Sequence, residues 1–246
     1  MIDTISTAVA RHRRPVLTVG LLLAGGNAVA MGYAPDLARA VLLPVLALAL
    51  TALVLAIITL GNRPAALVVS PRPPSFTPPV AGWRVLLTLG LLGQASTTVG
   101  SYLRSAEAGI DTTVDAVLGV LWLGLIALLV RAAWRGHDVR LDPEGVRVQG
   151  LLGSRTVPWE ARPAAGTTRD AGRSPMRLPL TIANPELVRR HGLVVGRRAR
   201  LPVDSVDARF LTTVISHYVA HPQHRPAIGT PDEYRRLLTH LRGAAG

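Results

Sequence analysis

The sequence predicts a membrane all-α region of four transmembrane helices, followed by a small α+β domain in which a helix caps a small β-barrel. Four apolar runs, each near the about 20 residues that cross a bilayer, fill the first 135 residues. The charges between these runs alternate in sign, and from residue 136 onward the apolar residues alternate with polar ones instead of running continuously. These three observations define the predicted fold class.

The composition limits the chemistry of the chain. Its 246 residues carry a formal net charge of +12, and 49% of them are hydrophobic. There is no cysteine, which excludes disulfides, thiolate metal sites and cysteine nucleophiles. All 27 residues of the lysine and arginine class are arginine, a bias that favours a bacterial source with a GC-rich genome.

The four runs are predicted to be transmembrane helices over residues 15–34, 40–60, 85–103 and 114–134. The second run has no charged residue, whereas the third contains Gln94, Ser96 and Thr97. Small and polar residues of this kind allow helices to pack closely and to form hydrogen bonds with one another. The alternative is that the polar third span lines a solute path, as in a small transporter or channel component.

Arginines predict the orientation of the spans. Three arginines lie within the basic N-terminal segment, residues 1–14, and three more lie between the second and third runs. The two other connections hold acidic residues beside only Arg39 and Arg104. Because cytoplasmic loops are enriched in positive charge, both termini are expected in the cytoplasm of a multi-pass protein of the cell (inner) membrane. A cleaved signal peptide ending near Ala30 is an alternative for the first run, but the apolar stretch continues past that point.

Residues 136–228 are predicted to form the cytoplasmic β domain. Val139 and Leu141 alternate on one strand and Val146 and Val148 on the next, around the turn residues 142–145. SRTVPW, PLTIAN and RRARLPV are expected to be further strands, and TRDAGRSP a loose loop. The proline-rich segment NRPAALVVSPRPPSFTPPVAGW, residues 62–83, is expected to be an irregular connector.

Two helices are predicted to complete the domain. Asp207 is the expected N-cap of the first, whose apolar face contains Phe210 and Leu211. Trp159 and Phe210 are the expected large anchors of the core. Residues 229–246 are predicted to form a short amphipathic helix that begins with a capping box, Thr230 to Glu233.

The segments DVRLDPEGVRVQGLLGSRTVPWE, LTIANPELV and RARLPVDSVDARFLTTVISHYVAHPQHR resemble the bacterial pleckstrin-homology-like (PH-like) domain, in the version that actinobacteria fuse to membrane spans. The resemblance implies a cytoplasmic PH-like barrel with a C-terminal helix. Lipid-binding eukaryotic relatives carry clustered basic residues in the first hairpin, whereas this chain has the acidic turn Asp142-Pro143-Glu144-Gly145. Phosphoinositide binding is therefore not implied.

Histidines near the end of the first predicted helix raise the question of a metal site. His217 and His221 are four residues apart, and His224 follows. However, Pro222 stops the helix, and neither a cysteine nor an acid close in sequence supplies the missing ligands. Histidines in a last turn interact favourably with the helix carbonyls, so a helix ending is expected rather than a metal site.

Known catalytic motifs are missing from the sequence, so we expect no enzyme activity, no catalytic residue, no cofactor and no nucleic-acid partner. The expected function is that of a scaffold or accessory subunit that binds a protein partner or contacts an anionic membrane. The candidate contact residues are a cluster of five arginines: Arg189, Arg190, Arg197, Arg198 and Arg200. A merely solvated polar face is the alternative for them.

Overall fold

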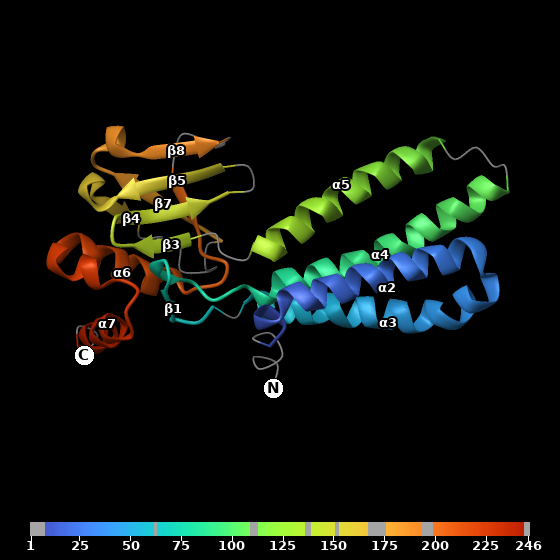
Figure 1. Cartoon of the computed structure of the whole chain (residues 1–246), viewed down its shortest axis with the longest axis horizontal. Helices are drawn as coiled ribbons and strands as arrows, with labels where there is room; N and C mark the ends of the chain where they lie inside the picture. The colour runs from blue at the N-terminus through green and yellow to red at the C-terminus, as the bar shows by residue number, and fades with distance from the viewer. Residues whose placement is uncertain are drawn as a thin grey trace. The chain divides into compact units, whose positions relative to one another are not determined.

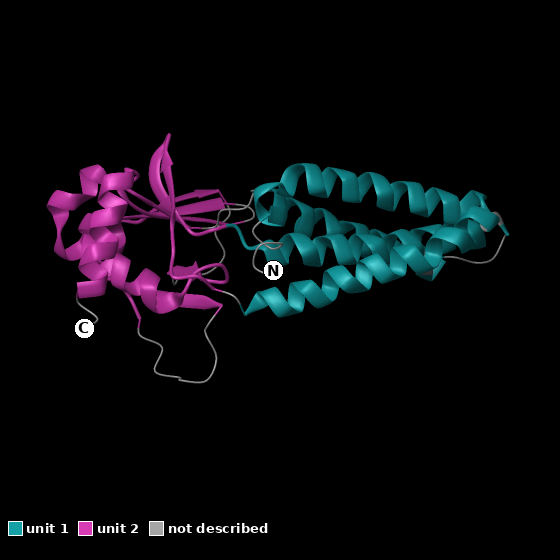
Figure 2. Cartoon of the chain, turned by 90° about the horizontal axis from the view of Figure 1, so that it is seen from below, with its two compact units in different colours: residues 1–62, 80–136 teal, residues 63–79, 137–246 magenta. Residues whose placement is uncertain are grey.

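A computed structural model of the chain describes residues 8–61, 63–108, 113–135, 139–150, 153–166, 176–192 and 199–243. It consists of two compact units. The helix unit contains residues 1–62 and 80–136, and the sheet unit contains residues 63–79 and 137–246, coloured separately in Figure 2. The chain therefore enters the sheet unit twice, once between two helices and once after the last of them.

Four long helices make up the helix unit: α2 (Arg13–Tyr33), α3 (Pro35–Leu60), α4 (Gly82–Glu107) and α5 (Thr113–Arg135) (Figure 1). Three segments among the described residues are long and apolar enough to cross a membrane, namely Arg13–Tyr33, Asp36–Leu60 and Ala116–Trp134. Helix α4 covers the third predicted span but is less apolar than this criterion requires.

Helix α4 packs against each of the other three helices. At one of these contacts the buried Asn27 Nδ2 donates to Ser96 Oγ over 2.8 Å, which confirms the expected interhelical hydrogen bonding. At another contact a Cβ on Gly90 would collide with the side chain of Leu53, so the absence of a side chain there allows α3 and α4 to approach closely. Small and polar residues of α4 therefore serve packing within the helix unit.

The sheet unit contains two antiparallel sheets (Figure 1). The larger has the order β1-β2-β3-β4-β5-β8, formed by Val68–Pro71, Pro74–Thr77, Val139–Asp142, Gly145–Gln149, Gly153–Pro158 and Arg189–Gly192. The smaller has the order β6-β7-β9, formed by Pro163–Ala165, Arg177–Ile182 and Ala199–Pro202. Short 3₁₀ segments η1 (Trp159–Ala161) and η2 (Pro185–Leu187) connect strands of the two sheets.

The predicted closed barrel is not what the structure shows, because no strand pairing among the described residues joins the six-stranded sheet to the three-stranded one. The two sheets instead contribute to one hydrophobic core. The expected strands SRTVPW, PLTIAN and RRARLPV correspond to β5, β7 and β9. The expected loop TRDAGRSP lies outside the described residues.

The proline-rich connector contains two β-strands, contrary to the expectation that it is irregular. Residues 68–77 form the hairpin β1–β2, and β2 joins the larger sheet by pairing Phe76 with Leu141. Prolines are tolerated here because Pro71 belongs to the edge strand β1 and Pro74 is the first residue of β2, positions at which a ladder N–H group is dispensable. Phe76 is fully buried and lies against Tyr218 and Tyr234, with ring centroids 6.4 and 5.5 Å away.

One of the two predicted aromatic anchors occupies the core. Trp159 is buried, and its indole N–H donates to the carbonyl oxygen of Asp142 over 2.9 Å. Phe210 was expected to be a second anchor but is only half-buried at the margin of the core. The buried face of its helix is centred on Leu211, Ile215 and Tyr218, which turns Phe210 partly outward.

Two helices end the chain: α6 (Ala208–Ala220) and α7 (Pro231–Gly243), joined by η3 (Pro222–Ala227). Asp207 is the N-cap of α6, as predicted: its carboxylate accepts a hydrogen bond from the Phe210 N–H over 2.7 Å. In α7, Thr230 Oγ1 accepts from the Glu233 N–H over 3.3 Å, as one half of the predicted capping box. The Glu233 side chain itself lies in the interior of the unit.

Candidate functional site

The structure describes three of the five candidate arginines and distributes them over different surfaces. Arg189 and Arg190 are exposed neighbours on β8, so their side chains leave opposite faces of the larger sheet. Arg200 is exposed on β9 of the smaller sheet. Arg197 and Arg198 lie outside the described residues. The sequence cluster is thus not one face of one sheet.

A different row of basic residues crosses the larger sheet. Arg140 on β3 is the register partner of Arg147 on β4, Arg147 pairs with Thr156 on β5, and Thr156 pairs with Arg189. Register partners point to the same face of a sheet, so Arg140, Arg147 and Arg189 share the face opposite to the core. We call these three residues the arginine row. Arg147 Nε lies 3.9 Å from the Asp142 carboxylate, which offsets part of its charge.

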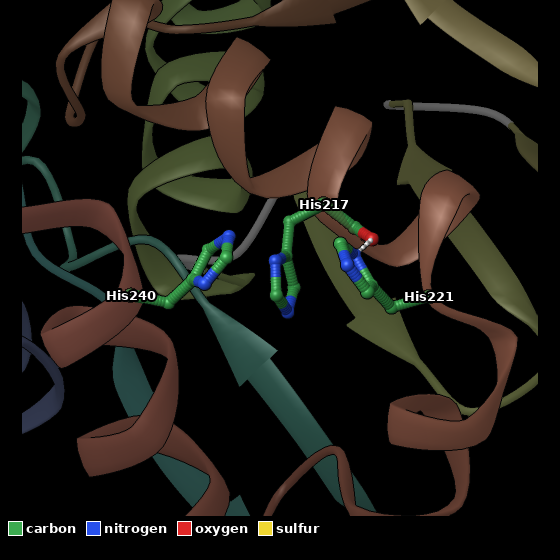
Figure 3. Close-up of side chains that lie close together, drawn as sticks. All are labelled: His217, His221 and His240. Carbon is green, nitrogen blue, oxygen red and sulfur yellow. Dashed lines mark hydrogen bonds between the residues drawn. The ribbon is translucent and has the colours of Figure 1, made fainter. Parts of the chain in front are cut away.

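The second candidate is a group of histidines that we call the histidine cluster: His217, His221, His224 and His240. His217 and His221 stand at the end of α6, His224 in η3 and His240 in the last turn of α7. The ring centroid of His217 lies 4.5 Å from that of His221, 5.3 Å from that of His224 and 4.8 Å from that of His240. Figure 3 shows the first and last of these neighbours on either side of His217.

The local sequence explains how these rings come together. Helix α6 ends before Pro222, as the sequence predicts, and η3 begins at this proline. Gly229 then reverses the chain with a φ of 94°, and a side chain there would collide with the backbone of Pro74 and Ser75. Helix α7 follows directly and presents Glu233, Leu237 and His240 on one face, at helical spacing.

The hydrogen bonds of the cluster assign part of its protonation. His221 Nδ1 lies 2.9 Å from the His217 carbonyl oxygen, which can only accept, so His221 Nδ1 carries a hydrogen. This bond is the expected interaction with the helix carbonyls. His217 Nε2 lies 3.2 Å from His224 Nδ1, while His217 Nδ1 is buried without a hydrogen-bond partner among the described residues.

Burial, together with the smaller repulsion from the nearby His221, His240 and His224, lowers the pKa of His217 to about 4. The His217 imidazole is therefore neutral at physiological pH, and a neutral imidazole offers a lone pair. A carboxylate lies close to this ring, because a ligand atom of Glu233 is within 4.8 Å of those of His217 and His224. Glu233, only 1% exposed, accepts from Tyr218 Oη over 3.3 Å and from Arg236 Nη1 over 2.9 Å.

Two triplets of potential metal ligands follow from this geometry: His217 with His221 and His240, and His217 with His224 and Glu233. Within each triplet the ligand atoms lie within 4.8 Å of one another. The sequence pattern drew attention to His217, His221 and His224, but not to Glu233 and His240, the potential ligands on α7. The available signal was the spacing of Glu233, Leu237 and His240, which places them on the face of α7 that also carries its apolar residues.

Comparison with family models, curated proteins and solved structures finds no match to this chain.

Proposed function

We propose that the chain is a multi-pass protein of the cell membrane whose sheet unit is a cytoplasmic PH-like binding module. In this proposal it acts as a scaffold or accessory subunit and not as an enzyme. The observation that carries the proposal is the pairing of β2 with β3, since it puts the α3–α4 connection and the segment after α5 in one folded sheet.

This pairing bears on the number of spans. Residues on one sheet lie on one side of a membrane, so the chain crosses an even number of times between β2 and β3. In the part of the chain between these strands that the structure describes, α4 and α5 are the helices, and α5 contains a segment long and apolar enough to span. If α5 crosses, α4 crosses as well. With α2 and α3, which contain the other two apolar segments, the total is then four spans.

The composition of α4 is compatible with a fourth span. A transmembrane helix surrounded by other helices needs less apolar surface than one surrounded by lipid. Helix α4 packs against α2, α3 and α5, and its Ser96 hydroxyl accepts a hydrogen bond from Asn27 of α2. By contrast, outward side chains of the other helices are large and apolar, for example Leu22, Leu43 and Val120 at 69–74% exposure. Such surfaces are typical of lipid contact.

Arginine distribution then favours a cytoplasmic sheet unit. Arginines gather at the end of the helix unit from which the chain enters the sheet unit: three lie at or just before the start of α2 (Arg11, Arg13, Arg14), three lie between the ends of α3 and α4 or in the first turn of α4 (Arg63, Arg72, Arg84), and two lie at the end of α5 (Arg131, Arg135). Most of the α3–α4 connection, residues 63–79, belongs to the sheet unit. The positive-inside rule assigns these segments to the cytoplasm, together with both termini.

The arginine row and the residue pattern of a PH-like domain support a binding role for the sheet unit. Two antiparallel sheets followed by the amphipathic α6 are compatible with that resemblance, although the sheets are open. Arg140, Arg147 and Arg189 give one sheet face a positive potential that suits anionic headgroups or an acidic protein surface. The transporter alternative gains little, because Ser96, Thr97 and Thr98 hydroxyls donate to carbonyls of their own helix.

Reporter fusions to the full chain test the topology. Reporters after Gly61 and Gly136 are expected to read cytoplasmic, and a reporter after Ala108 external. Cross-linking in native membranes, followed by mass spectrometry, is expected to recover a protein partner. An external reading after Gly136, or solute transport by the purified chain in liposomes, contradicts the proposal.

A further inference from the structure

The histidine cluster brings four of the seven histidines of the chain to one place, from three segments that are separate in sequence. Helix α6 and its C-cap provide His217 and His221, η3 provides His224, and α7 provides His240. Packing alone does not account for such a group, because close imidazoles repel one another once protonated and stabilise the fold less than apolar residues would.

The distances suit one metal ion. Zn–N bonds of about 2.0–2.1 Å in a tetrahedron put two ligand nitrogens about 3.3 Å apart. The ligand atoms of His217, His221 and His240 all lie within 4.8 Å of one another, so shifts of about 1 Å bring them to that separation. Such shifts are within reach of ring rotations, and the His240 side chain is exposed, so it has room to move.

The protonation of the rings also suits a metal. Because His221 Nδ1 donates to the His217 carbonyl oxygen, the lone pair of a neutral His221 is on Nε2. A ligand histidine held by a backbone carbonyl through its other nitrogen is the usual arrangement in metal sites. His217 is only 6% exposed and retains a buried ring nitrogen without a hydrogen-bond partner among the described residues. A buried polar atom of this kind requires an explanation, and a bound ion provides one.

A negative charge is placed near the cluster. Glu233 Oε1 and Oε2 bond Tyr218 and Arg236, and a carboxylate ligand atom of Glu233 lies within 4.8 Å of those of His217 and His224. A buried carboxylate at this distance stabilises a divalent cation without having to bind it directly.

We propose that His217, His221 and His240 bind one Zn²⁺ ion or a similar divalent transition-metal ion, which ties α7 to the end of α6. His224 is the adjacent residue that orients the His217 ring. An all-imidazole set selects ions such as Zn²⁺, Ni²⁺ and Cu²⁺ over Mg²⁺ and Ca²⁺, which prefer oxygen ligands. This inference does not depend on the function proposed above, because it concerns only residues within the sheet unit.

The test uses the full chain, purified in detergent without a polyhistidine tag and stripped of metal. Zn²⁺ is titrated in competition with a chromogenic chelator, and Co²⁺ serves as a spectroscopic probe. We expect one Zn²⁺ per chain, a tetrahedral Co²⁺ spectrum in the visible range, and no competition from Mg²⁺. Zn²⁺ is also expected to raise the melting temperature of the sheet unit, because it binds only the folded state.

Two variants and one control assign the ion. His240→Gln removes an exposed ligand, and His221→Gln removes a half-buried one, so both chains are expected to fold. Each is expected to weaken Zn²⁺ binding at least about 10–100-fold, the loss that outer-shell changes alone produce. His191→Gln changes an exposed histidine on β8 and is expected to leave binding unchanged. Absence of stoichiometric Zn²⁺ binding, or binding that survives both cluster variants, overturns the proposal.

Discussion

In the helix unit, large apolar side chains point outward, whereas in the sheet unit they point inward. Leu43 and Ile57 of α3 are 74% and 71% exposed, while Trp159 and Tyr218 of the sheet unit are at most 1% exposed. The outward apolar residues need no burial in protein if lipid surrounds them, and the helix unit is then held together by close approach and by hydrogen bonds such as Asn27 to Ser96. The sheet unit depends on removing apolar surface from water.

This difference means that similar substitutions have different costs in the two units. Truncation of an interior aromatic residue is expected to be severe in the sheet unit. Enlargement of a small residue at a helix contact is expected to be the damaging change in the helix unit. Four substitutions, each with a matched control, test the interactions of the two units in order of decreasing expected effect.

The largest effect is expected for Phe76→Ala. Phe76 is fully buried against Tyr218 and Tyr234, although it belongs to the α3–α4 connection. Truncation of a buried Phe costs about 3–5 kcal/mol of unfolding free energy. Pulse proteolysis of the full chain in urea and detergent measures the loss in the sheet unit.

Phe210→Ala is the matched control for that experiment. Phe210 is half-buried, so its truncation is expected to cost clearly less than that of Phe76. Equal losses for the two variants would show that the hairpin contributes no more to the core than the margin of α6 does.

The three most apolar helices could be predicted from the sequence, because a single local property, the length of a continuous apolar run, is enough to identify them. The hairpin β1–β2 could not be predicted in this way. Phe76 pairs with Leu141, 65 positions further along the chain, and the prolines around it are local signals for irregular structure. Phe210 was misplaced because it lies at the edge of the apolar arc of α6, where burial depends on neighbouring elements.

The candidate sites show the same limit. Local spacing identified His217 and His221 but not His240, which only the turn at Gly229 brings back to them. Crowding in sequence grouped Arg189 with Arg190, yet alternation along β8 separates them. Arg140 and Arg147 join Arg189 through strand register, a property of the pairing between segments and not of any one segment.

In the helix unit, Gly90→Leu is expected to destabilise the contact between α3 and α4. A side chain at Gly90 collides with Leu53 and approaches the backbone oxygen of Ala49. Overpacking of this kind costs about 1–3 kcal/mol. Thermal unfolding in detergent, followed by helical circular dichroism, measures the change.

Gly25→Leu is the control, because a Cβ at Gly25 meets no atom of a neighbouring element within 4 Å. Both substitutions replace a helical glycine with the same good helix former, so the gain in helix propensity cancels between them. If Gly25→Leu destabilises the chain as much as Gly90→Leu, close packing of α4 is not what holds the helix unit together.

A smaller effect is expected at the start of α6. Asp207→Ala removes the acceptor for the Phe210 N–H and is expected to cost about 1 kcal/mol. Asp207→Asn retains a capping oxygen and is expected to preserve stability within a few tenths of that value. The urea midpoint of the sheet unit distinguishes the two. A comparable loss for Asn would assign the effect to the charge of Asp207 and not to its hydrogen bond.

The smallest effect is expected for substitutions in the arginine row, on the face of the larger sheet opposite to the core. If the arginine row contacts anionic headgroups, each arginine contributes on the order of 1 kcal/mol, and added salt screens the contribution. Hydrogen exchange of β8, an edge strand, is then slower in nanodiscs of phosphatidylglycerol than in phosphatidylcholine at low salt. Arg189→Gln is expected to reduce this protection several-fold, and Arg190→Gln, which changes the opposite sheet face, to reduce it less. Equal exchange in the two lipids at low salt means that the arginine row is solvated or is reserved for a protein partner, in which case the unit meets its membrane only through the chain that tethers it.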